Sequence, residues 1–139
     1  MNAKVFLQKT AFFVTGIFVS LISVYLIGYT TAIAMPTSFL TFFGSFSIFV
    51  WDLFVVNFLG IGIIAFLFAF VVFRTLKQPK IVHGLVSALG ILFGAYVVVP
   101  LLFGIPLYYS FIRSWWGYGF ELCVLLAFVS AWFLSGRRA

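Results

Sequence analysis

The chain has 139 residues, of which 65% are hydrophobic, 22% aromatic and only 7% charged, and its formal net charge is +6. A soluble domain of this size cannot bury so much apolar surface, because too large a share of it would face water. The composition therefore excludes a soluble globular protein and indicates one surrounded by lipid. Long uninterrupted apolar runs favour helices over the alternating strands of a membrane barrel.

Four apolar segments are candidates for crossing a bilayer, whose hydrocarbon core of about 30 Å needs about 20 helical residues. They cover residues 10–35, 47–73, 81–105 and 117–134. We therefore predict an all-α integral membrane protein with a single domain, residues 1–139, in which four transmembrane helices form two helical hairpins.

The basic residues predict how these helices are oriented. Lys4 and Lys9 precede the first segment, Arg74, Lys77 and Lys80 lie between the second and third, and Arg137 and Arg138 follow the fourth. With four spans, all the basic residues except Arg113 fall on one side. Because cytoplasmic loops are enriched in Lys and Arg, we expect both termini to be cytoplasmic, in a bacterial inner membrane.

Two similar sequence motifs occupy the predicted outer loops. Residues 38–44 read SFLTFFG and residues 110–117 read SFIRSWWG. The likeness suggests a 2+2 repeat of residues 1–76 and 77–139 with the same topology in each half. The alternative is that aromatic side chains collect at membrane interfaces without any duplication.

The aromatic residues of these loops are too apolar to stand in water. We expect Phe42 and Phe43 in one loop, and Trp115 and Trp116 in the other, to form an aromatic lid at the outer surface. Such a lid either lies among the lipid headgroups or covers a partner subunit.

The polar residues inside the apolar segments are the candidate site. An ionised carboxylate in lipid costs at least about 2.5 kcal/mol, so Asp52 marks a pathway, a pair or a partner. Asp52 and Glu121 both lie near the outer start of a segment, where the helix macrodipole favours an acid. Three interpretations stay open: helix-start acids paired with Arg113, a proton, cation or ligand site, and an intersubunit contact.

Asn57 follows Asp52 by five residues, which places it on a different but not opposite face of an α-helix. Its amide needs a hydrogen-bond partner, and a bond to a neighbouring helix is the ordinary solution. We therefore interpret Asn57 as a residue that joins helices, or as a second member of a ligand site with Asp52.

Small residues recur at helix-packing spacing in every segment. They are Gly16 and Ser20, Ala65 and Ala69, Gly84 with Ala88, Gly90 with Gly94, and Ala127 with Ala131. In lipid, such rows let helix backbones approach closely. They predict either a compact bundle or docking onto the helices of another protein.

Pro100 lies inside the third segment. Because proline has no backbone N–H, it removes the hydrogen bond to the carbonyl of Tyr96 and predicts a kink. Broken helices can expose backbone at transport sites, although a proline kink is more often only a matter of shape.

The sequence has no residue arrangement typical of an enzyme. No nucleophile has a base in reach, no glycine-rich loop suits a phosphate, and the single histidine, His83, cannot complete a metal site within the chain. We expect a non-catalytic protein with no cofactor, no metal and no nucleic acid among its partners, which would be membrane lipids and other membrane-protein subunits.

The leading functional hypothesis is an accessory or assembly subunit that docks onto a larger membrane complex through the small-residue rows and aromatic loops. The second is a homo-oligomeric transporter, flippase or channel that uses Asp52 and Asn57. In size, charge and number of spans the chain is also similar to immunity proteins of pore-forming bacteriocins. That resemblance carries no shared motif and implies a third hypothesis, a protective binding protein.

Overall fold

The computed structural model describes residues 2–75, 81–106 and 118–136. Within these ranges the chain is helical and has no strand, which confirms the predicted all-α class. Three helical stretches are long and apolar enough to cross a membrane, namely Ala3–Thr30, Thr37–Arg74 and Ile81–Phe103. A fourth apolar helix, Gly119–Leu134, is shorter. The lengths and apolar composition of these helices are thus compatible with an integral membrane protein.

Helix α1 (Ala3–Thr30) begins and ends earlier than the predicted segment at 10–35. It begins where the side chain of Asn2 accepts a hydrogen bond from the backbone N–H of Lys4 at 3.2 Å, which caps the first turn. It ends at Thr30, and Pro36 keeps the residue before it, Met35, out of the helical conformation, so that helix resumes only at Thr37. Residues 31–36 therefore form a turn rather than the end of a span.

The second apolar stretch contains five consecutive helical pieces. They are α2 (Thr37–Phe43), a 3₁₀ turn η1 (Gly44–Phe46), α3 (Ser47–Trp51), a π-helix η2 (Asp52–Gly62) and α4 (Ile63–Thr75). Gly44 has φ +56°, a conformation that glycine adopts without strain, and it separates α2 from the longer helix that follows. That longer helix runs from Ser47 to Thr75 through α3, η2 and α4.

The third stretch consists of α5 (Ile81–Phe93), a π-helical turn η3 (Gly94–Val98) and α6 (Val99–Phe103). Pro100 lies in the first turn of α6, directly after η3. The wider π-helical turn thus occurs where the proline withholds a backbone donor, as expected of a proline inside a membrane helix. Gly104, with φ +69°, ends α6.

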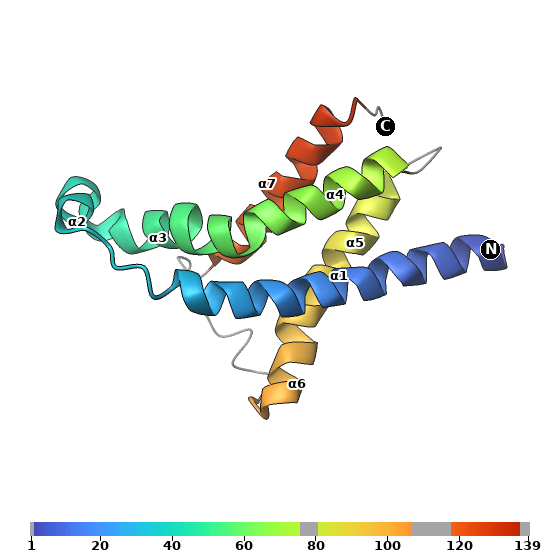
Figure 1. The fold of residues 1–139 in the computed structure, drawn as a ribbon, viewed down its shortest axis with the longest axis horizontal. Coiled ribbons are helices and arrows are strands. Elements are labelled where there is room, and N and C mark those ends of the chain that lie inside the picture. Colours follow the sequence, from blue (N-terminus) through green and yellow to red (C-terminus); the bar gives the residue numbers. More distant parts are fainter. Residues whose placement is uncertain (1, 76–80, 107–117, 137–139) are drawn as a thin grey trace.

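The helices pack around η2. Helix α1 crosses α5 and also packs on η2, whereas α7 (Gly119–Leu134) packs on α4 and η2, so that η2 lies between α1 and α7. Figure 1 shows the pairs α1 with α5 and α4 with α7 as two crossings. The predicted 2+2 repeat stays a prediction.

Two of the small-residue rows meet at the crossing of α1 and α5. A Cβ added at Gly16 would lie 2.6 Å from the carbonyl oxygen of Ser87. One added at Gly90 would collide with the carbonyl oxygen of Phe13, and one at Gly94 with the hydroxyl of Ser20. These glycines therefore allow two backbones of the same chain to touch.

The other rows also lie inside the molecule. Ala65, Ala69, Ala127 and Ala131 are buried where α4 meets α7. A Cβ added at Gly84 would lie 2.5 Å from the ring of Phe73, and Ala88 packs against the same core. These small residues therefore lie at contacts between helices of the same chain.

Candidate intramembrane polar site

Asp52 and Asn57 are hydrogen-bonded to each other. The amide nitrogen of Asn57 donates to the backbone carbonyl of Asp52 at 2.9 Å and to its carboxylate Oδ2 at 2.8 Å. In an α-helix the two side chains would point about 140° apart. In a π-helix, hydrogen bonds join residues five apart, so these positions return to nearly the same face. The predicted separation onto different faces was wrong because this segment is not α-helical, and the amide bonds within its own helix rather than to a neighbour.

Helix α7 begins against this pair. A Cβ added at Gly119 would lie 2.6 Å from Asp52 Oδ2 and 3.0 Å from the amide nitrogen of Asn57. Glu121 follows Gly119 by two residues, on the first turn of α7. The start of α7, which carries Glu121, therefore packs against Asp52, although the sequence placed the two acidic residues in separate segments.

Side-chain donors reach three backbone carbonyls in the first half of η2. The Asn57 amide donates to the carbonyl of Asp52. The thiol of Cys123 on α7 donates to the carbonyl of Leu53 at 3.3 Å. The hydroxyl of Thr30 on α1 donates to the carbonyl of Val56 at 2.9 Å. In lipid, backbone carbonyls need partners from the protein itself. Donors from three helical elements thus support the π-helical backbone that brings Asp52 and Asn57 together. Sequence reasoning missed Thr30 and Cys123, whose roles have no local signal.

A pocket of about 350 Å³ adjoins the pair. Its lining residues are Val24, Ile27, Ile48, Asp52, Asn57, Ala95, Tyr96 and Phe120. The rings of Tyr96 and Phe120 lie 6.2 Å apart at 63°. The pocket thus combines one carboxylate, one amide and two aromatic rings with aliphatic walls, and its size suits a small ligand.

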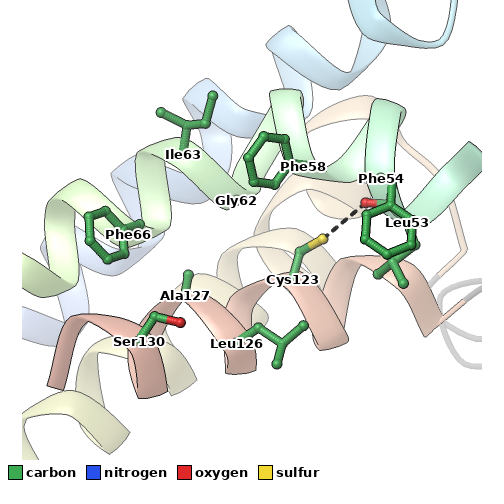
Figure 2. Close-up of a pocket in the computed structure, with 10 residues that line it drawn as sticks. All are labelled: Leu53, Phe54, Phe58, Gly62, Ile63, Phe66, Cys123, Leu126, Ala127 and Ser130. Atoms are coloured by element: carbon green, nitrogen blue, oxygen red, sulfur yellow. Dashed lines mark hydrogen bonds between the residues drawn. The ribbon is translucent and has the colours of Figure 1, made fainter. Parts of the chain in front are cut away.

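A second, almost entirely apolar pocket of about 370 Å³ lies between α7 and the η2–α4 helix. Figure 2 shows its lining residues, which are Leu53, Phe54, Phe58, Gly62, Ile63, Phe66, Cys123, Leu126, Ala127 and Ser130. The bond from Cys123 to the carbonyl of Leu53 closes one end of it. Adjacent residues of η2 therefore line different pockets, Asp52 the polar one and Leu53 the apolar one.

The predicted aromatic lid is described only in its first half. Phe42 is 82% exposed and Phe43 half-buried, with ring centroids 4.8 Å apart. The ring centroid of Phe39 lies 5.2 Å from that of Trp51, the residue before Asp52, so Phe39 connects this aromatic group to the polar site. The predicted residues Arg113, Trp115 and Trp116 lie outside the described residues.

The third stretch contributes to the pocket through η3 rather than through its proline. Ala95 and Tyr96 of η3 line the pocket, whereas Pro100 is buried in α6 and is not among the lining residues. Within residues 2–75, 81–106 and 118–136, no three His, Cys, Asp or Glu side chains form a group that could hold a metal ion. No protein-family model, curated protein or solved structure matches the chain.

Proposed function

We propose that this chain is a small cation-binding membrane protein of the transporter or channel class, with Asp52 as the ligand residue. The observation that carries the proposal is the hydrogen-bonded pair of Asp52 and Asn57 in the wall of a pocket. A carboxylate in a low-dielectric environment is costly unless a positive charge is bound near it. A bound cation would supply that charge.

The proposed topology has four spans, with both termini on the cytoplasmic side of a bacterial inner membrane. In Figure 1 the beginnings of α1 and α5 and the ends of α4 and α7 lie toward the same end of the molecule, which supports this arrangement. Arg74 follows Asp52 by 22 residues, on the order of 30 Å along a helix. This length matches the hydrocarbon thickness, so Asp52 would lie at the outer boundary, within reach of external solution.

The proposal is tested by the response of the purified protein to cations. The protein in nanodiscs is heated in the presence of inorganic and organic cations, and its unfolding temperature is compared with that of Asp52→Asn. A ligand that binds only the folded state raises this temperature. We expect a cation-dependent rise in the wild type and none in Asp52→Asn, which keeps the shape and removes the charge. An equal rise in both would exclude Asp52 as the ligand.

A competing account pairs the acids with Arg113. Under that account the wild type would show no response to cations, and Arg113→Gln would create one, because the internal cation has been removed. A response of the wild type that Arg113→Gln leaves unchanged would support the proposed site.

An accessory subunit is the second candidate, favoured by the outward face of α1. Large side chains on that face are exposed at helical spacing, namely Leu7, Val14, Phe18, Ile22, Tyr25 and Tyr29. The hydroxyls of Tyr25 and Tyr29 are hydrogen-bonded to each other at 2.9 Å, a polar feature that a partner helix could use.

The two candidates predict different native masses. Gentle extraction followed by native mass spectrometry would find stoichiometric different polypeptides with an accessory subunit, and a homo-oligomer with a small transporter or channel. Replacing Phe18 by alanine should weaken the first kind of complex and leave the second kind unchanged if α1 is the docking face.

A further inference from the structure

The polar pocket presents hydrogen-bond acceptors. Carbonyl and carboxylate oxygens of Asp52 can only accept, so the Asn57 amide must turn its nitrogen toward them. Oδ1 of Asn57 and Oδ1 of Asp52 are then the remaining oxygens of the pair, and no donor in the described ranges of the chain bonds to either. A ligand that fits these two oxygens carries N–H donors and a positive charge.

The rest of the pocket is unsuited to a small hydrated ion. Its aliphatic walls, which include Val24, Ile27 and Ile48, offer nothing to replace a water shell. A volume of about 350 Å³ also exceeds what one bare ion fills and lies in the range of small-molecule sites. The rings of Tyr96 and Phe120 supply faces that attract an organic cation.

We infer that the ligand is an organic ammonium ion with at least two N–H donors and an apolar body, held by Asp52 and Asn57 and enclosed by Tyr96 and Phe120. This inference rests on the proposed function and adds the class of ligand to it. The ammonium group donates to Oδ1 of Asp52 and Oδ1 of Asn57, and the alkyl or aryl body fills the apolar part of the pocket.

Equilibrium binding to the full chain in nanodiscs of zwitterionic lipid tests the inference with four probes. Phenethylammonium has the charge, the donors and the apolar body; its trimethylated analogue keeps the charge without donors. 2-Phenylethanol is neutral, and sodium ion has no body. We expect phenethylammonium to bind about tenfold or more tightly than the trimethylated analogue, because a lost charged hydrogen bond exceeds 1.4 kcal/mol, or about one decade. The alcohol and sodium should not compete.

Two variants test separately the binding of the ammonium group and the binding of the apolar part of the ligand. Asp52→Asn should weaken phenethylammonium at least about tenfold. Ala95→Leu, which adds volume to the pocket wall, should weaken binding of phenethylammonium and leave binding of methylammonium unchanged. Equal weakening of both amines by Ala95→Leu would mean that the apolar body does not lie there, and would overturn the inference.

The remaining outcomes distinguish failure of the ammonium inference from failure of the proposed function. Equal affinity for phenethylammonium and its trimethylated analogue, or displacement by sodium, would overturn the ammonium inference while Asp52-dependent binding of a cation kept the proposed function. If no cation bound in a manner that depends on Asp52, both would fail.

Discussion

The crossing of α1 with α5 and the contact of η2 with α7 join helices in different ways. At the first, glycines bring two backbones together, and the serines bond within their own helices: Ser20 to the carbonyl of Ile17 at 2.6 Å and Ser87 to that of His83 at 2.8 Å. At the second, the thiol of Cys123 on α7 donates to the backbone carbonyl of Leu53 in η2 and so joins the two helices by a hydrogen bond. In the first interface side-chain volume matters most, and in the second hydrogen bonding does.

The two contacts differ in what they contribute: the α1–α5 crossing contributes to stability, and the η2–α7 contact contributes to the proposed binding site. Close contact of regular helices leaves no room for a ligand, and its energy comes from dispersion and fit. An irregular helix changes the faces on which its side chains lie, and the polar and the apolar pocket described above both adjoin η2. π-helical segments often occur at functional sites for this reason. The two regions should therefore respond differently to substitution.

The largest effect is expected for Gly90→Leu at the α1–α5 crossing. The new side chain would meet the backbone of Phe13, which cannot move aside as a flexible side chain could. We expect a loss of several kcal/mol, or failure to assemble. The measurement is the yield and unfolding temperature of monodisperse protein after extraction.

Gly28→Leu is the control for that variant, since a Cβ at Gly28 has no atom within 4 Å. It should behave like the wild type. A Gly90→Leu protein of normal yield and unfolding temperature would show that the crossing is not packed as described.

The next largest effect is expected for Gly119→Ala at the start of α7. The added methyl group would displace the carboxylate of Asp52 or the amide of Asn57. We expect cation binding to fall at least about tenfold, with a loss of stability of about 1–3 kcal/mol from overpacking. Binding and unfolding temperature are measured on the same samples, with Gly28→Ala as the control, and unchanged binding would remove Gly119 from the site.

A smaller effect is expected for Thr30→Val, which keeps the shape and removes the hydroxyl that bonds to the carbonyl of Val56. Hydrogen bonds between membrane helices contribute about 0.6 kcal/mol on average and at most about 1.7 kcal/mol. Thr31→Val is the matched control, because the hydroxyl of Thr31 bonds only within α1, to Gly28. Equal unfolding temperatures of the two variants would contradict a role for Thr30 in supporting η2.

The smallest effect is expected for Cys123→Ala, because a thiol is a weak donor. We expect a loss of about 1 kcal/mol or less, including the volume lost beside the apolar pocket. Cys123→Ser restores a donor to the carbonyl of Leu53 and should recover part of the loss. A larger loss in the serine variant than in the alanine variant would mean that apolar packing, and not the bond, is what Cys123 supplies.

The sequence by itself determined the class of protein and the packing residues. Composition excludes a soluble fold because it leaves too little polar surface, and the run lengths predict helices, which the described residues form. The small-residue rows that contain Gly16 and Gly90 predict close helix packing. A residue without a side chain lets a neighbouring backbone approach closely, and this property can be read from the sequence alone.

Only the tertiary structure decided the polar site. Residues 52–62 form a π-helix, and two of the donors to its backbone carbonyls come from distant parts of the chain, Thr30 on α1 and Cys123 on α7. The π-helical backbone brings Asn57 within hydrogen-bond distance of Asp52. Gly119, which has no side chain, lets α7 pack beside this pair. Spacing along one helix cannot reveal it, because the bonds from Thr30 and Cys123 are made between helices and form only when the bundle packs.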